Sequence, residues 1–245
     1  MRTAIYLTLV IFISYSEILA QRLSKSSVEK LSKSVFEETT LTGLKFRSIG
    51  PAQTSGRVSD FAINPNNFKE YYVAAASGGV WKTVNAGTTY IPVFDEAGSY
   101  SIGCITMDPN NANVIWVGTG ENNNQRSVPY GDGVYKSIDG GETWKNMGLK
   151  SSEHIGKILV DPNNSNIIYV AAIGPLWSSG GERGVYKSVN GGETWRLMLG
   201  IDADTGINDL IMDPRDSQVI YAAAYQRRRH VFTYLGGGPG SGLHK

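Results

Sequence analysis

The chain of 245 residues has little cysteine, little histidine and almost no net charge. Cys104 is its only cysteine, so no disulfide can form within the chain, and the three histidines, His154, His230 and His244, lack metal-ligand spacing. A formal net charge of +1 gives no electrostatic reason to expect nucleic acid or an anionic membrane as a partner. The sequence also lacks phosphate loops, nucleophile elbows and cysteine-based metal motifs. We therefore expect no metal and no other cofactor.

Long hydrophobic runs are also scarce, and the notable one lies at the N-terminus. Arg2 precedes an apolar run over residues 4–13, and Ala20 is followed by Gln21. A positive start, a short apolar segment and a small residue before the cut are typical of a secretory signal peptide. The run is too short for a comfortable transmembrane span, and a retained membrane anchor is the alternative. We expect cleavage of residues 1–20, no stable membrane insertion and a mature protein that is periplasmic, cell-surface or extracellular.

Glycine and aromatic residues are abundant, with 29 Gly, 13 Tyr and 5 Trp. This composition suits an all-β protein with many short strands and tight turns. The string SIDGGETW at 137–144 returns as SVNGGETW at 188–195, and a degenerate copy, TVNAGTTY, lies at 83–90. Two other strings recur with it: INPNN, MDPNN, VDPNN and MDPRD, and GVWK, GVYK, GVYK and GLHK. The period of about 50 residues matches a propeller blade of four strands.

We therefore predict a partial β-propeller of four-stranded antiparallel blades over residues 46–245. About three and a half blades are too few to close a ring, since propellers typically have four to eight. We expect the remaining blades of a longer parent chain as partners; a complete small protein would leave strand edges unpaired. Val28, Leu31 and Val35 have helical spacing, so residues 21–45 are expected to form a lead-in with a short helix. The blades are expected at about 56–94, 102–147, 155–199 and 207–245.

The repeated string, called the box below, is explained by the hairpin between the third and fourth strands of a blade. Glycine at the tip supplies the positive φ that tight hairpins need. The side chain of Asp139 or Asn190 can accept bonds from turn amides, and the indole that follows packs between neighbours. The residues to which we assign this structural role are Ser137, Asp139, Gly141, Thr143, Trp144, Ser188, Asn190, Gly192, Thr194 and Trp195.

The pattern Ser-x-Asp/Asn-Gly-Gly-x-Thr-Trp resembles the Asp-box, or BNR repeat, of sialidases, xyloglucan-specific hydrolases, the sortilin ectodomain and photosystem assembly factors. With GRVSDFAINPNN and SGGVWKTVNAG, it most resembles bacterial exported proteins described as sortilin N-terminal-domain-like or BNR-repeat glycosyl-hydrolase-like. The resemblance covers residues 45–245 and implies a propeller whose boxes lie opposite the ligand-binding face. It is specific for fold rather than activity, because enzymes and pure binders both carry the box.

Connections between the second and third strands are long and variable, at 121–132, 174–183 and 226–241. Such loops on a rigid scaffold usually carry function. Their arginines, aromatics and carboxylates suit a sugar or a peptide with acidic groups, and a solvated loop side chain is the alternative for each residue. Our candidate ligand-binding residues are Glu121, Arg126, Tyr130, Asp132, Trp177, Arg183, Arg227, Arg228 and His230.

These features predict an exported propeller module that binds a glycan or an extracellular peptide. One alternative is a glycoside hydrolase whose catalytic carboxylates lie partly in further blades; another is a structural or assembly scaffold. A glycosidase needs two carboxylates flanking the bond, and loop position alone makes candidates of Glu121, Asp132, Glu153 and Glu182. The resemblance to xyloglucan hydrolases implies an aspartate just before a Gly-Gly strand in the first blade, where this chain has Ala76 and Ser77.

Overall fold

The computed structural model describes residues 56–123 and 128–245. The predicted signal peptide, the lead-in and Arg126 lie outside these described residues. Within them the chain forms sixteen strands and one 3-10 turn, η2, at Lys150–Ser152. The all-β class predicted from the composition is therefore confirmed.

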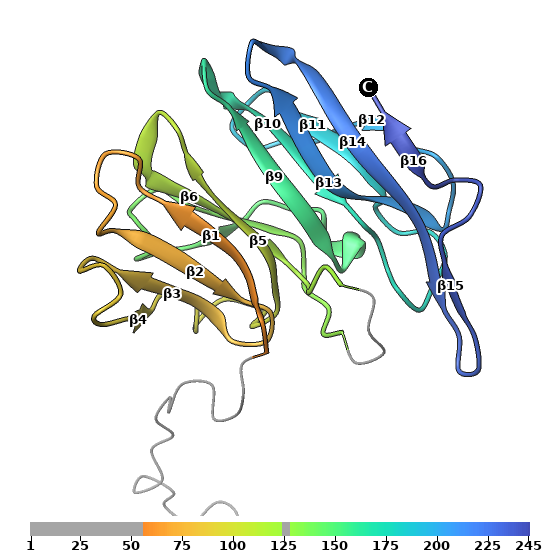
Figure 1. Cartoon of the computed structure of the whole chain (residues 1–245), viewed down its shortest axis with the longest axis horizontal. Helices are drawn as coiled ribbons and strands as arrows, with labels where there is room; N and C mark the ends of the chain where they lie inside the picture. The colour runs from red at the N-terminus through yellow and green to blue at the C-terminus, as the bar shows by residue number, and fades with distance from the viewer. Residues whose placement is uncertain (1–55, 124–127) are drawn as a thin grey trace, which may run out of the picture. The chain divides into compact units, whose positions relative to one another are not determined.

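Antiparallel sheets follow one another along the chain as the blades of a propeller (Figure 1). The first blade consists of β1 (Val58–Ile63), β2 (Tyr71–Ala75), β3 (Gly79–Thr83) and β4 (Ile91–Pro92). The second consists of β5 (Ile102–Asp108), β6 (Asn111–Thr119), β7 (Val134–Ser137) and β8 (Lys145–Asn146). The third consists of β9 (Ile155–Asp161), β10 (Asn164–Ala172), β11 (Gly184–Ser188) and β12 (Arg196–Leu199). These sheets confirm the prediction of four-stranded antiparallel blades.

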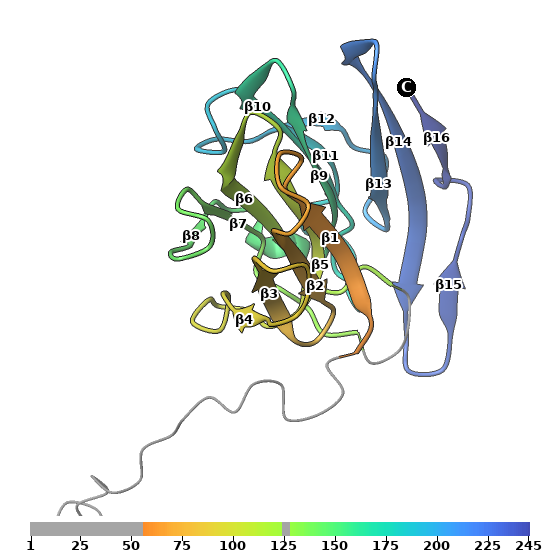
Figure 2. The ribbon, with the colours of Figure 1, turned by 60° about the vertical axis from the view of Figure 1, so that its left-hand side comes forward.

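The fourth blade departs from this pattern. It consists of β13 (Thr205–Asp213), β14 (Asp216–Arg229), β15 (Tyr234–Gly236) and β16 (Gly242–His244). β14 pairs with β13 on one edge and with β16 on the other, and its last residues pair with β15. The prediction of a loop over 226–241 was wrong in part, because β14 continues to Arg229 and pairs there with β15. Figure 2 shows the β14–β15 hairpin projecting beyond the other strands.

The blades pack through their first strands and through apolar clusters that span neighbouring blades. β1 contacts β5, β5 contacts β9 and β9 contacts β13. Tyr72 of the first blade shares one buried cluster with Ile105 of the second, and later clusters join the second to the third blade and the third to the fourth. Glycine permits the first strands of neighbouring blades to lie this close together. A Cβ on Gly103 would lie 2.1 Å from the Ile155 carbonyl oxygen, and a Cβ on Gly156 would lie 2.4 Å from the Asn208 carbonyl oxygen.

The box closes the hairpin between the third and fourth strands of its blade. In the second blade, Gly141 has φ 92° and its N–H donates to Ser137 Oγ at 2.8 Å. The N–H of Thr143 donates to Asp139 Oδ1 at 2.9 Å. The third blade repeats these contacts, because the N–H of Gly192 donates to Ser188 Oγ at 2.9 Å and that of Thr194 to Asn190 Oδ1 at 3.0 Å.

Each box tryptophan also joins its blade to the preceding one. Trp144 Nε1 donates to the carbonyl of Val93, in the first blade, at 2.6 Å. Trp195 Nε1 donates to the carbonyl of Met147, in the second blade, at 2.7 Å. The box is therefore a contact between blades as well as a turn within one.

Candidate functional site

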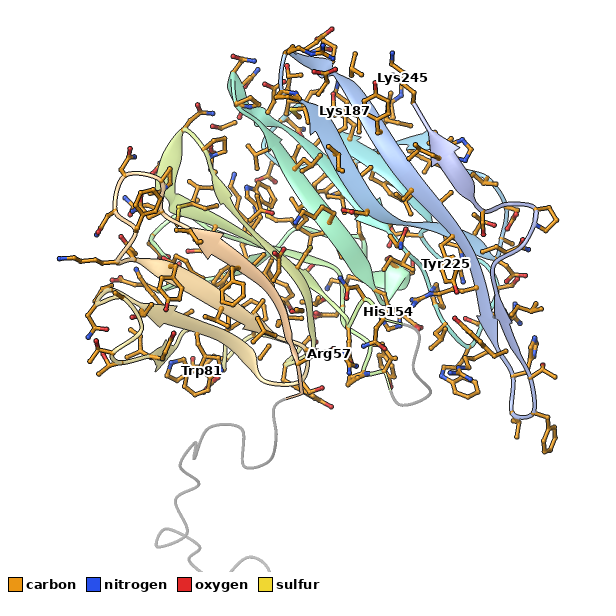
Figure 3. All side chains as sticks on the ribbon, viewed as in Figure 1. Arg57, Trp81, His154, Lys187, Tyr225 and Lys245 are labelled. Carbon is orange, nitrogen blue, oxygen red and sulfur yellow. The ribbon has the colours of Figure 1, made fainter. Side chains whose placement is uncertain are left out.

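The connections between the second and third strands lie opposite the boxes, because successive antiparallel strands reverse direction. The connections that lead from one blade to the next reach this same face. Figure 3 shows Arg57 and His154 near one another on it, with Lys187 and Lys245 toward the opposite end of the blades. Arg57 precedes β1, Glu121 follows β6, His154 precedes β9 and Arg227 lies near the end of β14. All four blades therefore contribute side chains to this face, called the loop face below.

Glu121 holds together the connections of three blades. Its buried carboxylate pairs with the Arg57 guanidinium from the first blade and also accepts from the amide of Asn123. Its backbone N–H donates to Ser101 Oγ at 2.9 Å, and its carbonyl accepts from His154 Nδ1, of the third blade, at 2.8 Å. Glu121 therefore holds the connections of three blades in place on the loop face.

His154 is buried beneath these connections in its neutral form. Burial lowers the pKa of its imidazole to about 3, and the positive charge of Arg227 acts in the same direction. Because the Glu121 carbonyl can only accept a hydrogen bond, Nδ1 carries the proton and Nε2 does not. The ring therefore donates to the loop while adding no charge to it.

Two arginines organise the connections of the third and fourth blades from inside. The buried Arg183 guanidinium donates to four backbone carbonyls of its own loop, at 2.5–3.0 Å. Arg227 is fully buried and donates to the carbonyls of Asn123 at 2.9 Å and Gly174 at 3.4 Å. Burial lowers the pKa of Arg227 to about 10, with a contribution from the charge of Arg183, so it remains protonated at neutral pH. Both side chains therefore bind backbone rather than facing solvent.

The other predicted site residues differ in their partners within the protein and in their exposure to solvent. Asp132 accepts from the Tyr135 hydroxyl at 2.6 Å, and Arg228 pairs with Asp204 at 2.8 Å. Tyr130 is 72% exposed and Trp177 is 46% exposed, and His230 is exposed as well. The predicted set thus divides into residues that shape the loops and residues that a ligand could contact.

The loop face carries further exposed aromatic residues that the sequence analysis did not select. Phe232, between β14 and β15, is 94% exposed, and Tyr100, on the connection from β4 to β5, is also exposed. Tyr130 and Trp177 belong to the connections of the second and third blades. Large aromatic rings held in water by ordered loops offer flat apolar surfaces to a ligand. In the sequence, the regular spacing of strands within the repeat was the signal that could have placed Phe232 on this face.

Among the carboxylates, Glu153 differs from the others. Glu182 accepts from the Ser151 N–H and hydroxyl, both at 2.9 Å. Glu153 has a left-handed backbone, with φ 61°, and its backbone carbonyl accepts from the N–H of Gly131 at 2.8 Å. Burial raises the pKa of its carboxyl, although the charges of Arg183 and Arg227 oppose the shift. Glu153 is therefore the carboxyl on this face best suited to donate a proton or a hydrogen bond.

No group of three or more His, Cys, Asp and Glu side chains that could hold a metal occurs within residues 56–123 and 128–245. In the same described part of the chain, no helix is long and apolar enough to span a membrane.

Two curated proteins that resemble this chain are xyloglucanases. No protein-family model matches it. It is 28% identical over 176 residues to a xyloglucanase of Hypocrea jecorina, a match that covers 66% of this chain and 20% of the relative. It is 26% identical over 137 residues to xyloglucanase Xgh74A of Acetivibrio thermocellus, covering 51% of this chain and 15% of the relative. The chain thus spans a fifth or less of the length of these curated relatives.

A solved structure shows a similar fold. An ancestral GH74 enzyme superposes with a TM-score of 0.55 and 25% identity, covering 71% of this chain and 23% of that one. The fold is a β-propeller with GH74 xyloglucanase-like neighbours.

Proposed function

We propose that this chain is part of an exported β-propeller that binds a glycan of the xyloglucan class on its loop face. The observation that carries the proposal is the set of exposed rings on that face: Tyr130, Trp177 and Phe232. The apolar faces of sugar rings stack on aromatic side chains, while their hydroxyls bond to nearby polar groups. An extended polysaccharide, which can reach rings on several connections, suits this set better than a compact ligand does.

The buried network beneath the rings supports the proposal. Arg183 donates to the carbonyls of Pro175 and Ser178, on either side of Trp177. Arg227 anchors the end of β14, which precedes Phe232, to the carbonyls of Asn123 and Gly174. The backbone that carries these rings is therefore ordered before a ligand binds. The names of the similar proteins give the class of glycan. We also propose that the boxes are Asp-boxes of the BNR type, that the protein is sortilin-like in its propeller, and that residues 1–20 direct export.

The proposal is tested by binding of a xyloglucan oligosaccharide to the full chain, measured by isothermal titration calorimetry. Trp177→Ala and Phe232→Ala are each expected to weaken binding about tenfold, the effect of removing a central aromatic contact. Phe68→Ala is the matched control, because Phe68 is 76% exposed but lies between β1 and β2, on the side of the boxes. An acidic peptide titrated in parallel distinguishes a peptide-binding module. Equal binding by all variants, or binding of the peptide alone, would contradict the proposal.

A glycoside hydrolase is the second candidate, favoured by the raised pKa of the Glu153 carboxyl. A general acid needs such a carboxyl beside the leaving oxygen, and a second carboxylate on the other side of the bond. In the first blade, the position at which the resemblance to xyloglucan hydrolases implies an aspartate holds the buried Ala76 instead. Release of reducing ends from xyloglucan, abolished by Glu153→Gln with binding retained, would establish hydrolysis. Absence of release would leave the binding function in place.

A further inference from the structure

Every blade carries the same lysine-aromatic pair near the boxes. The lysine ends the GVWK, GVYK, GVYK or GLHK string, and its ammonium lies over a ring on the second strand of the blade. The distances from Nζ to the ring centroid are 5.2, 4.9, 4.9 and 5.8 Å for Lys82–Tyr72, Lys136–Trp116, Lys187–Tyr169 and Lys245–Tyr221. The contact repeats in four blades, and hydrogen bonds in the first two blades show what the pair binds.

In the first two blades the pair receives the box of the following blade. Lys82 Nζ and the Tyr72 hydroxyl donate to the carbonyl of Gly140, at the tip of the second-blade box, at 3.1 and 2.8 Å. Lys136 Nζ donates to the carbonyl of Gly191, at the tip of the third-blade box, at 3.1 Å. Glycine is required beside that tip, since a Cβ on Gly192 would lie 2.6 Å from the Trp116 ring.

The third blade presents the same receiving groups beside an open groove. Lys187 and Tyr169 line a groove of about 460 Å³ between the third and fourth blades, together with Met198, Leu199 and Lys245. Met198 lies three residues after Trp195, as Met147, whose carbonyl accepts from that indole, lies three residues after Trp144. The three boxes within the described residues belong to the first, second and third blades.

We propose that this groove is a binding site for a fourth box hairpin. Lys187 Nζ would donate to the carbonyl at the tip of that hairpin, Tyr169 would support the tip glycines, and the Met198 carbonyl would accept from the box indole. GVYK immediately precedes the box that begins at Ser188, and GLHK is its counterpart in the fourth blade. A hairpin in the equivalent position would therefore lie beside β16. In a chain that continues beyond Lys245, the ligand is the chain's own next segment. This assignment does not depend on the glycan proposal.

The test extends the full chain after Lys245 with a copy of residues 188–199, SVNGGETWRLML, which restores the order of the third blade. The tether makes docking intramolecular, so even a weak contact is measurable as a rise in thermal midpoint, expected to be about 5 °C. A matched extension whose tryptophan is replaced by alanine controls for simple strand pairing with β16. Lys187→Met should remove at least half of the rise, whereas Lys69→Met, at an exposed lysine of the first blade, should leave it intact.

The assignment is overturned if intact and altered extensions stabilise the protein equally, or if Lys187→Met lowers the midpoint of extended and unextended proteins by the same amount. A second measurement covers an extended protein that fails to fold. The free peptide KSVNGGETWRL is added to the unaltered chain, and amide exchange is followed by mass spectrometry. Protection at 185–187 and 196–199 supports the site, and unchanged exchange there at millimolar peptide contradicts it.

Discussion

Replacing Trp195 by phenylalanine tests the contact that joins the second and third blades. The indole N–H donates to the Met147 carbonyl at 2.7 Å, and the ring packs on the buried cluster between these blades. Phenylalanine keeps most of the apolar contact but cannot donate. The substitution therefore isolates the hydrogen bond from the packing.

The expected cost follows from the state in which the Met147 carbonyl is left. A lost neutral hydrogen bond costs about 0.5–1.5 kcal/mol, and a buried acceptor left without a donor costs about 1–3 kcal/mol. Trp195 is only partly buried, so water reaches some of the vacated space and the lower part of that range applies. We expect Trp195→Phe to lower the free energy of unfolding by about 1–2 kcal/mol. Trp195→Ala should cost about 3 kcal/mol, because it also removes ring packing.

Urea unfolding followed by circular dichroism measures both values. Trp177→Phe is the control, since its exposed ring should make the change worth less than about 0.5 kcal/mol. Trp144→Phe should repeat the result of Trp195→Phe, because Trp144 donates to Val93 in the same way. A cost for Trp195→Phe no greater than that of the control would refute the reasoning that the box joins adjacent blades.

Three further predictions follow from buried groups. Gly156→Ala should destabilise the protein by about 1–3 kcal/mol in urea unfolding, because its Cβ would meet the Asn208 backbone, whereas a cost near zero would show that the inner strands can separate. The Cys104 thiol, buried and with a pKa raised by burial to about 12, should react with a thiol reagent only at the rate of unfolding; fast labelling in native buffer would contradict its burial. His154, whose pKa is about 3 when folded and about 6.5 when unfolded, contributes stability above pH 6.5 that is lost as the pH falls toward 3. Free energies of unfolding obtained from urea titrations at pH 6.5, 5.5 and 4.5 should fall in the unmodified protein by up to about 1.4 kcal/mol per pH unit, and less steeply in His154→Asn; parallel profiles would count against a buried neutral imidazole.

The repeating features of the fold were predictable from the sequence because they arise locally. The DPNN turns, the glycine tips and the alternation of Val and Ile set each strand within a few residues of its turn. The blade pattern could therefore be recognised from two clear boxes and one degenerate copy. Ser137 and Ser188 lie in equivalent turns for the same reason, since the box places its acceptors and donors within eight residues.

The loop face was less predictable because its contacts connect distant parts of the chain. Arg227 lies in a run of three arginines that favours a solvated loop. It is nevertheless buried, and it donates to the carbonyls of Asn123 and Gly174, 104 and 53 residues away in the sequence. The β14–β15 hairpin arises because Arg229 pairs with Tyr234 and also lies over its ring, 4.2 Å from the centroid. The spacing of residues in the sequence predicts neither the carbonyls that Arg227 binds nor the pairing of Arg229 with Tyr234. The sequence therefore indicated Tyr130 and Trp177 but not Phe232, which became evident as an exposed ring only in the structure.

Amide hydrogen exchange of the full chain, with and without a xyloglucan oligosaccharide, tests the central claim most directly. The account predicts slower exchange in the connections at 173–183 and 226–236, with no change in the box turns at 137–144 and 188–195. Protection confined to the box turns, or exchange unaffected at saturating oligosaccharide, would contradict glycan binding on the loop face.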